Sequence, residues 1–398
     1  MTNETIICFG YSPHWDFWRQ DHDIVLRLSK KNKVVYIENQ LGYSTYRSMK
    51  KSVWRGIWGD GEPRWINKNL VVFSAPPRLP RGLPFDSANT KHNFAGKSII
   101  ISKRLLEIKV KKMLNRLNLM PTIFWCFEPY DLPLVGHFGE RASCYRVYDE
   151  VSLFPGRISY MKAVEDIEER YIGNVDFVFA SSRCQYEKRR NLNRNTFFIP
   201  NACDFDRYNK TLLDDHLPIP QDIKEIPYPI VGFIGNIDSR LDIELIELLS
   251  ASHPEWSLVL IGWGERKLIG EIQAKKRSNI YFLGEKKVVE LPSYLRVIAV
   301  SIIPYMLSES TKTMYPRKLH EHLAAGKPIV CTDLPEVRPF KNVVRIAETK
   351  QEFLSCIEEE LLTNNDEKIK KRVRVARKNT WENRIKEMVR IIEDGKSE

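Results

Sequence analysis

A lysine and a glutamate three residues apart are the side chains in this sequence best suited to binding a phosphorylated ligand. Lys318 and Glu321 lie in the segment YPRKLHEHLAAGKPIVCTDLP, which begins at Tyr315. Residues with this spacing share one face of a helix, and Pro316 suits a first helical turn. The free N–H groups of a helix start attract phosphate, and a carboxylate one turn later could accept hydrogen bonds from ribose hydroxyls. An ordinary crossover helix with a solvated salt bridge is the alternative interpretation.

Two glycine-containing turns could bring backbone groups to the same ligand. The run VGFIGNIDSRLD places Gly235 directly after an apolar stretch, and LVLIGWGE places Gly262 after the next one. In α/β folds such turns let a phosphate approach the backbone closely. Arg240 could pair with a diphosphate, because guanidinium geometry fits phosphate. A tight turn with a surface arginine is the alternative.

Short apolar runs that alternate with helical patterns must position these residues. The alternation indicates parallel βαβ units, and therefore an α/β fold with doubly wound sheets. In the first half, the expected strands are Thr5–Phe9, Val34–Glu38, Leu70–Ser74, Thr122–Phe127, Cys144–Tyr148, Phe177–Ala180 and Phe197–Ile199, with helices at Asp21–Lys31 and Ser102–Leu117. In the second half, the expected strands are Ile230–Ile234, Ser257–Ile261, Ile280–Leu283, Val300–Ile303, Ile329–Cys331 and Val343–Ile346, with helices at Asp242–Ser250 and Gln351–Leu362.

The length of 398 residues predicts two domains, because it exceeds the usual size of one hydrophobic core. The proline-rich run LPIPQDIKEIPYP indicates an extended linker. A long basic helical pattern follows from Lys368 to Asp394. We therefore expect an N-terminal Rossmann-like domain at 1–210, a linker at 211–229, a second Rossmann-like domain at 230–375 and a terminal helix at 376–398.

Composition narrows the class of protein. With 43% hydrophobic and 28% charged residues the chain has the make-up of a folded globular protein, and it has no apolar run of the roughly 18–20 residues that cross a bilayer. The start MTNETIICFGY has no basic segment before its apolar stretch, so we expect a first strand and not a signal peptide. Seven scattered cysteines without a CxxC pair favour reduced thiols in the cytoplasm over disulfides or a zinc site. The net charge of +11 predicts attraction to polyanions such as nucleic acid, anionic lipid or phosphorylated sugar carriers.

The segment that begins at Tyr315 resembles the donor-binding signature of GT-B glycosyltransferases of the retaining, family-four type, P-x-K-x-x-E-x-x-A-x-G-K-P-V-V. The matching residues are Pro316, Lys318, Glu321, Ala324, Gly326, Lys327, Pro328, Ile329 and Val330. A second run, FFIPNACDFDRY, is similar to the family's I-P-N-G-V-D-x-x-x-F, with matches at Asn201, Cys203 and Asp204 and with Ala202 in place of the glycine. The resemblance implies two domains that face a cleft, a nucleotide-sugar donor held by the second domain, and a terminal helix that returns to the first.

One position departs from the family pattern. The common pattern has two glutamates separated by seven residues, and counting back eight from Glu321 gives Thr313. The resemblance is therefore to a branch of bacterial polysaccharide glycosyltransferases, including the teichuronic-acid type, that lacks the first glutamate. We expect the loop SESTKT, with Thr311 and Thr313, to cover the sugar and diphosphate with hydroxyls and N–H groups. Glu321 keeps its role as a donor-binding and catalytic candidate.

Two segments of the first half supply candidates on the acceptor side. CYRVYDEVSLF carries Asp149 at a strand end, where relatives place a His or Asp that faces the cleft, so Asp149 is our candidate for catalytic contact with the sugar or acceptor. Capping of a turn is the alternative. In the loop GYSPHWDFWRQDH, Arg19 and His22 could bind an acceptor, while Trp15 and Trp18 could simply pack.

The resemblance also implies how the reaction proceeds. The sugar–diphosphate bond ionises towards an oxocarbenium-like state, and cations and helix dipoles stabilise the departing diphosphate. The leaving phosphate could itself take the acceptor proton, so we assign no general base. We expect no metal and no cofactor other than the nucleotide-sugar substrate.

Basic and aromatic segments suggest a membrane surface. The pattern at Ser102–Leu117 pairs an apolar stripe with lysines and arginines, which suits an anionic bilayer or simply a helix that covers the sheet. In Tyr43–Trp65, aromatic residues alternate with basic ones, as at a bilayer interface or in single-strand binding.

Three hypotheses remain open. The leading one is a cytoplasmic glycosyltransferase, peripheral at the inner face of the membrane, that moves a sugar from a nucleotide-diphosphate donor to a cell-surface polysaccharide or lipid-linked acceptor with retention of configuration. A GT-B-fold sugar-nucleotide epimerase, or a donor-binding protein without transferase activity, is the alternative. A nucleic-acid-binding protein driven by charge is the third, and it is disfavoured because no RNA- or DNA-binding module is present.

Overall fold

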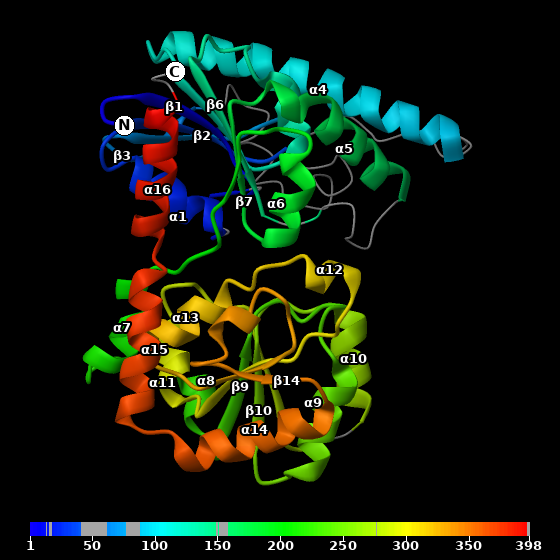
Figure 1. The fold of residues 1–398 in the computed structure, drawn as a ribbon, viewed down its shortest axis with the longest axis vertical. Coiled ribbons are helices and arrows are strands. Elements are labelled where there is room, and N and C mark those ends of the chain that lie inside the picture. The colour runs from blue at the N-terminus through cyan, green and yellow to red at the C-terminus, as the bar shows by residue number, and fades with distance from the viewer. Residues whose placement is uncertain are drawn as a thin grey trace. The chain divides into compact units, whose positions relative to one another are not determined.

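The chain folds into two compact α/β units (Figure 1). The computed structural model describes residues 1–12, 14–15, 18–40, 62–76, 88–148, 150, 158–275 and 277–395, with 88–95 and 158–160 described by their backbone alone. Unit 1 comprises Met1–Pro200 and Ile385–Glu398, and unit 2 comprises Asn201–Arg384. Two segments discussed above, Asp149 and residues 43–61, lie outside the described residues.

Unit 1 is built on an eight-stranded sheet of order β3-β4-β2-β1-β5-β6-β7-β8. Its strands are β1 (Thr5–Phe9), β2 (Lys33–Ile37), β3 (Arg64–Asn67), β4 (Leu70–Phe73), β5 (Ile123–Cys126), β6 (Ala142–Val147), β7 (Phe177–Ala180) and β8 (Thr196–Phe198). All pairings are parallel except that of β3 with β4. The central strands β1, β5 and β6 are buried along nearly their whole length and mostly apolar, which is the pattern of a sheet covered on both faces.

Helices lie between these strands in the sequence and cover the sheet. They are α1 (Gln20–Leu28), α4 (Ala88–Arg116), η1 (Pro129–Leu134), α5 (Ile158–Tyr171), η3 (Ile172–Asn174) and α6 (Arg183–Arg190). The long helix α4 packs along α5 and η1. It begins before the expected Ser102, and its buried face contributes Leu106 and Val110 to the core beside Phe9 and Phe124.

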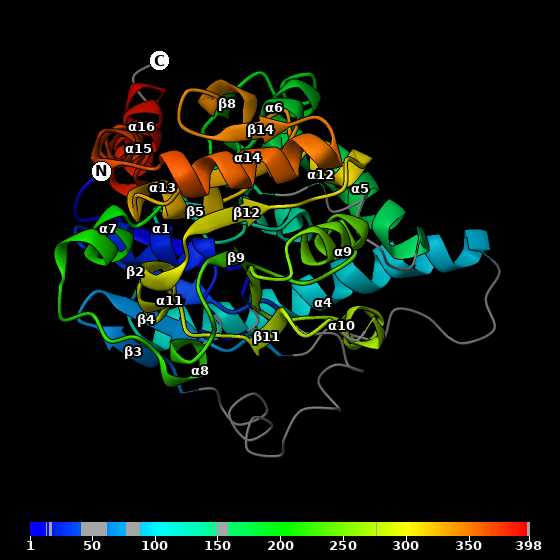
Figure 2. The same ribbon diagram turned by 90° about the horizontal axis from the view of Figure 1, so that it is seen from below.

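Unit 2 is built on a six-stranded parallel sheet of order β11-β10-β9-β12-β13-β14. Figure 2 labels strands β11, β9, β12 and β14 in that sequence across the sheet. Its strands are β9 (Ile230–Ile234), β10 (Ser257–Ile261), β11 (Ile280–Gly284), β12 (Val300–Ile303), β13 (Ile329–Thr332) and β14 (Arg345–Ala347). The chain runs outward from β9 to β11 and then crosses to β12 on the other side of β9. The strand order therefore reverses between β9 and β12, and ligands of open α/β sheets bind outside the carboxyl ends of the strands at such a point.

The helices of unit 2 connect and cover these strands. They are α7 (Phe205–Leu213), α8 (Gln221–Lys224), α9 (Ile243–Ser252), α10 (Arg266–Ala274), α11 (Leu291–Val297), α12 (Glu309–Lys312), α13 (Lys318–Ala324), η4 (Arg338–Phe340), α14 (Lys350–Thr363) and α15 (Asp366–Lys378). The last helix, α16 (Trp381–Asp394), belongs to unit 1 from Ile385 onward. Helix α13 packs against α7 and α15. None of the described helices in either unit combines the length and apolar character needed to cross a membrane.

Of the fourteen strands in the described residues, thirteen coincide with expected strands to within two residues at each end. The exception is β3, where Trp65 is 51% exposed and no residue is fully buried. Because β3 is an edge strand with both faces largely in solvent, its sequence RWIN carries no alternation of apolar and polar residues that could identify it.

The terminal helical pattern is divided in the structure. The expected continuous helix Lys368–Asp394 is two helices, α15 and α16, separated at Asn379 and Thr380. The Thr380 hydroxyl accepts a hydrogen bond from the Asn383 N–H at 3.2 Å, which starts α16 as an N-cap. The proline-rich run at 217–229 lies within unit 2 and contains α8, whose Ile223 is buried.

Candidate functional site

Two glycine turns meet at the carboxyl ends of β9 and β10. The Gly235 N–H donates to the Ile261 carbonyl at 2.8 Å, which joins the two strand ends. Gly235 has a φ of +156° and Gly262 a φ of +146°, backbone conformations that side chains rarely adopt. A Cβ atom on Gly262 would lie 2.0 Å from the Gly235 carbonyl oxygen. The two turns are therefore in backbone contact, and glycine is required at both.

A buried lysine lies against the first of these turns. Lys318 is 9% exposed, and its Nζ donates a 2.6 Å hydrogen bond to the hydroxyl oxygen of Tyr305. The same nitrogen lies 3.9 Å from the ring centre of Phe233 and 4.5 Å from that of Tyr305. A Cβ atom on Gly235 would lie 2.4 Å from it. The structure thus brings two of the predicted donor-binding residues, Lys318 and Gly235, into direct proximity.

Burial lowers the pKa of Lys318 well below its ordinary value, and the nearby guanidinium of Arg240 lowers it further. Asp238 and Glu321 act in the opposite direction but do not restore the pKa. The low pKa comes mainly from the lost hydration of the ammonium group and secondarily from Arg240. An anionic ligand would oppose the shift by favouring the ammonium form.

Arg240 belongs to the same cluster. Its guanidinium forms two hydrogen bonds with the Asp238 carboxylate, Nε to Oδ1 at 2.8 Å and Nη2 to Oδ2 at 2.5 Å. Its guanidinium carbon also lies 5.7 Å from the ring centre of Tyr305. The side chain is 19% exposed, so Asp238 holds the cation at the edge of the site without removing it from solvent.

Helix α13, which carries Lys318, is held near both ends by two asparagine side chains from residues 201–209. The Asn201 amide donates to the Tyr315 carbonyl at 2.9 Å, just before α13, and the Asn209 amide donates to the Ala324 carbonyl at 2.9 Å, at its end. The expectation that Pro316 lies in the first helical turn is wrong, because α13 begins at Lys318 after an N-cap at position 317. Asn201 lies in the segment matched to the family, and its role is structural here.

Glu321 points to a different partner from the one expected. Its Oε1 lies 2.9 Å from Nε of Arg317, four residues earlier, and this pair replaces the salt bridge considered for Lys318. Glu321 is 7% exposed. Its contact with a ribose or sugar stays a prediction, as does its catalytic role.

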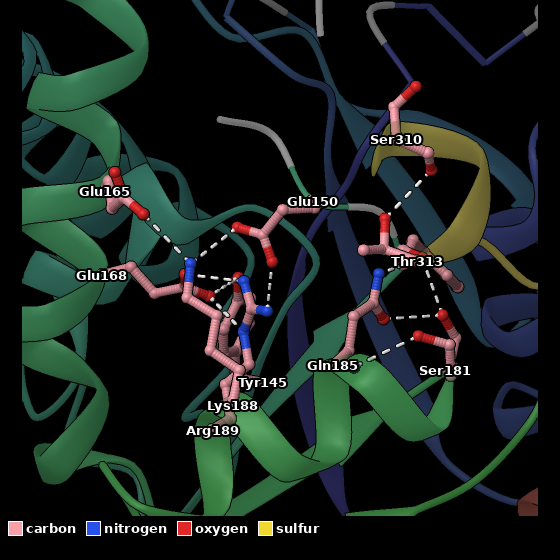
Figure 3. A network of polar contacts seen from close by, with 12 residues as sticks. Tyr145, Glu150, Glu165, Glu168, Ser181, Gln185, Lys188, Arg189, Ser310 and Thr313 are labelled. Carbon is pink, nitrogen blue, oxygen red and sulfur yellow. Dashed lines mark hydrogen bonds and ion pairs between the residues drawn. The ribbon is translucent and has the colours of Figure 1, made fainter. Parts of the chain in front are cut away.

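The segment after β12 forms a capped helical turn. The Ser308 hydroxyl accepts from the Thr311 N–H and the Thr311 hydroxyl accepts from the Ser308 N–H, a reciprocal capping box that starts α12. Thr311 is fully buried and its hydroxyl donates to the Met306 carbonyl at 2.5 Å. The Thr313 hydroxyl donates to the Ser310 carbonyl at 3.0 Å (Figure 3). The Thr311 hydroxyl is therefore committed within the segment, and Thr313 is the better placed of the two to meet a ligand.

The two acceptor-side candidates of unit 1, Arg19 and His22, differ in how exposed they are. Arg19 is exposed, whereas His22 is fully buried, with ring-centre distances of 4.4 Å to Trp15 and 5.4 Å to Trp18. The Arg19 N–H donates to His22 Nδ1 at 3.0 Å. Direct contact of an acceptor with His22 does not fit this burial, because both indoles cover the imidazole.

Asp21, a buried aspartate beside His22, was not identified as a candidate from the sequence. Asp21 Oδ2 accepts from the Tyr36 hydroxyl at 2.6 Å and from the Tyr11 N–H at 2.7 Å. Burial alone would raise the pKa of Asp21, but the adjacent His22 and the hydrogen bond from Tyr36 outweigh it and lower the pKa. Asp21 therefore holds the loop that follows β1.

A second buried network lies next to Asp149 in the sequence (Figure 3). Arg189 donates through Nη1 to Glu150 at 2.5 Å and through Nη2 to Glu168 at 2.8 Å, and Tyr145 donates to Glu168 at 2.8 Å. Arg189 is 2% exposed. Burial would raise the pKa of Glu150, but Arg189 outweighs it and keeps the carboxylate ionised. This network holds Glu150, directly after position 149, in place. No motif in the sequence predicted the network.

In the described part of the chain, no three or more His, Cys, Asp or Glu side chains lie close enough together to hold a metal ion. Two D-x-D tripeptides do occur, at 21–23 and 204–206. Their first members have structural roles: Asp21 binds Tyr36, and Asp204 accepts from the Arg207 N–H as the N-cap of α7.

Comparison with known proteins adds to this geometry. Residues 228–363 match the family described as Glycosyl transferases group 1. Over 230 residues the chain is 27% identical to a Bacillus subtilis (strain 168) protein named "Putative teichuronic acid biosynthesis glycosyltransferase TuaH". That alignment covers 55% of this chain and 57% of the relative, so the chain spans little more than half the length of the curated protein it matches.

Solved structures share the architecture of the whole chain. A sucrose-phosphate synthase from Thermosynechococcus elongatus superposes with a TM-score of 0.70 at 12% identity, covering 98% of this chain and 99% of that one. The Anabaena protein HepE, solved in complex with UDP and glucose, superposes with a TM-score of 0.59 at 12% identity, covering 98% and 99%. At this level of identity the likeness establishes the fold, which confirms the expected pair of Rossmann-like units.

Proposed function

We propose that this chain, which has the GT-B fold and carries a glycosyl transferases group 1 domain in unit 2, transfers a sugar from a nucleoside-diphosphate donor. The family match and the name of the B. subtilis relative support this activity. They also favour a cell-surface polysaccharide or a lipid-linked sugar as the acceptor. Retention of the anomeric configuration follows from the resemblance of the α13 segment to the family-four signature.

The observation that carries the proposal is the position of Lys318. Its Nζ lies against the Gly235 turn and beside Tyr305, at the carboxyl edge of the sheet and next to the reversal in strand order. Nucleotide phosphates bind at this edge in doubly wound folds. Arg240 adds a second cation on the same turn.

The residues suggest how the donor would react. Lys318 and Arg240 would stabilise the negative charge that develops on the departing diphosphate, in a site where desolvation strengthens the attraction. Glycine at position 235 lets the phosphate approach the backbone. Cleavage leaves an oxocarbenium-like sugar, and a phosphate oxygen of the leaving group takes the acceptor proton. We propose that these cations supply the positive charge in place of a metal ion.

Helix α4 supports a membrane-bound acceptor. Ile101, Leu105 and Ile108 share one face of the helix and are 50%, 48% and 65% exposed. Exposed cations flank this face at Lys97, Arg104, Lys109 and Lys112. Aliphatic side chains between cations suit the headgroup region of an anionic bilayer. We therefore propose a peripheral location at the cytoplasmic face of the membrane.

A panel of nucleotide-sugars, incubated with a lipid-linked acceptor pool and read by mass spectrometry, tests the proposal. A product that gains one sugar mass, and that is lost in Glu321→Gln, is the expected result. Donor turnover without an acceptor product would instead favour an epimerase. Oligonucleotide binding with a steep salt dependence and no donor turnover would favour a nucleic-acid-binding protein.

A further inference from the structure

One pocket of unit 2 lies away from the donor-binding candidates. It has a volume of about 240 Å³, below the roughly 300–1,000 Å³ of pockets that take drug-sized ligands. Its charged lining residues are Lys341, Arg345, Lys368, Lys371, Arg372 and Glu360. We name it the amino-edge pocket.

The amino-edge pocket is on the opposite edge of the sheet from Lys318. Ile329 and Arg345, the first residues of β13 and β14, line it together with the loop that precedes β14. Gly235 and Gly262 follow the last residues of β9 and β10. Because all six strands are parallel, the two sites are separated by the length of the strands, and a ligand in one does not reach the other.

Cations outnumber carboxylates in the amino-edge pocket. Glu360 is 5% exposed and shares its two oxygens among Arg372 at 3.0 Å, Lys368 at 3.1 Å and Arg345 at 3.2 Å. Arg345 also forms an ion pair with Glu359, so two carboxylates serve these three cations. Lys341 and Lys371 are exposed and line the same pocket.

Arg372 is a buried cation in the lining of this pocket. It is 3% exposed and also donates to the Gly326 carbonyl at 2.9 Å and to the Asn364 side chain at 2.8 Å. Even so, burial lowers the pKa of its guanidinium, with Glu360 opposing the shift only in part. A compact anion in the pocket would offset this desolvation.

We infer that the amino-edge pocket binds a phosphate group, held by Arg345 and by the lysines at 341, 368 and 371. Guanidinium and ammonium groups at the mouth of a small pocket match the geometry and charge of a phosphoryl oxyanion. The group can belong to free phosphate or pyrophosphate, or to a lipid headgroup. Lys370, Lys371, Arg374, Arg377 and Lys378 are all exposed along α15, so a lipid phosphate would meet further cations beside the pocket.

Calorimetric titration of the full chain with pyrophosphate, at saturating nucleoside diphosphate, tests this inference. The variant Lys341→Ala/Lys371→Ala removes two exposed cations of the pocket, and Lys224→Ala/Lys287→Ala removes two exposed cations elsewhere in unit 2. We expect the first variant to bind pyrophosphate at least about tenfold more weakly, the effect of losing one charge-assisted hydrogen bond, and the second to match wild type. Equal affinity in all three proteins, or no pyrophosphate binding, would overturn the inference.

A vesicle arm separates the two sources of phosphate. Phosphatidylcholine vesicles with and without phosphatidic acid are pelleted with the same three proteins, each also carrying Ile101→Ser/Ile108→Ser so that the exposed face of α4 does not contribute. Pelleting that needs phosphatidic acid, is lost in Lys341→Ala/Lys371→Ala and is displaced by pyrophosphate identifies a lipid headgroup. Pyrophosphate binding without vesicle pelleting identifies free phosphate. Nucleoside diphosphate affinity is measured on each variant, and it should stay unchanged whether or not the proposed transferase function holds.

Discussion

The Nζ atom of Lys318 donates a 2.6 Å hydrogen bond to the hydroxyl of Tyr305, and the same ring lies 4.5 Å beneath it. Tyr305 follows β12, while Lys318 opens α13, so the contact joins the strand end to the helix start. It holds a buried amine against the Gly235 turn, where burial and Arg240 lower its pKa. A charged amine in this position is unfavourable in the free protein because it is desolvated, and it favours the binding of an anionic ligand.

Substitution at the glycine turn should disturb Lys318 directly. Gly235→Ala places a Cβ atom 2.4 Å from the Lys318 Nζ, on a backbone conformation that costs an alanine about 1–3 kcal/mol. We expect nucleoside diphosphate affinity to fall by at least about tenfold, measured by calorimetry. Gly270→Ala in α10 is the matched control, because its Cβ meets nothing within 4 Å, and it should stabilise the helix by up to about 1 kcal/mol without changing affinity. Equal affinities in both variants would argue against a ligand at this turn.

The Arg189 network should dominate the stability of its region of unit 1. Arg189→Met leaves the buried Glu168 without its cation and Glu150 with Lys188 alone, and the expected loss is about 3–5 kcal/mol in the free energy of unfolding. The neighbouring Arg190→Ala breaks an exposed pair with Glu187 and a contact with the Tyr186 ring, where about 1 kcal/mol is expected. Urea unfolding of the two variants measures the difference. Similar midpoints for both would show that the buried pair contributes no more than the exposed one.

Two buried histidines make unit 2 sensitive to acid. Burial lowers the pKa of His320 and of His322 to about 3, and neither His322 nitrogen has a hydrogen-bond partner among the described residues. The unfolded chain binds these protons near pH 6.5 and the folded chain does not, so the stability they contribute is complete above pH 6.5 and is lost as pH falls towards 3. Each histidine should remove about 1.4 kcal/mol of stability per pH unit in that window.

His322→Leu should flatten this dependence. Urea unfolding at pH 7 and pH 5 is expected to show a smaller acid-induced loss than in wild type, by about 1.4 kcal/mol per pH unit below 6.5. His216→Gln, at an exposed position, is the control and should leave the slope unchanged. An unaltered slope in His322→Leu would mean that His322 is protonated in the folded protein.

The exposed face of α4 should govern binding to anionic vesicles. Ile101→Ser/Ile108→Ser removes two aliphatic side chains from this face, and we expect co-sedimentation with anionic vesicles to fall roughly tenfold or more. Leu213→Ser/Val289→Ser removes two exposed apolar residues of unit 2 and should have no effect. Equal pelleting of wild type on neutral and anionic vesicles would dismiss the electrostatic part of the proposal.

The sequence predicted the strands well because buried parallel strands are continuous apolar runs. Their carboxyl ends then locate Gly235, Gly262 and Lys318, and the structure brings these three together. The sequence could not predict contacts between side chains whose positions follow no periodic pattern. Arg317, one residue before the helix, takes Glu321 as its partner, and the capping box of α12 uses the Thr311 hydroxyl.

Burial of polar residues was the other source of error. The sequence suggested that His22 belongs to a surface loop, yet it lies in α1 and is enclosed by Trp15 and Trp18. The Arg189 network joins residues far apart in the sequence, and Arg189 itself sits in a run of basic residues that reads as a solvated helix end. Only tertiary packing distinguishes Arg189 from its exposed neighbour at 190.

Calorimetric titration of UDP and GDP into wild type and Lys318→Met tests the central claim most directly. Methionine keeps the length of the side chain and removes the amine, and Lys267→Met, at a side chain 90% exposed, controls for the change of charge. The account predicts that wild type and Lys267→Met bind at least one of the two nucleotides with equal affinity, while Lys318→Met binds it roughly 10- to 100-fold more weakly with an undiminished melting temperature. Unchanged affinity in Lys318→Met, or no binding of either nucleotide to wild type, would contradict it.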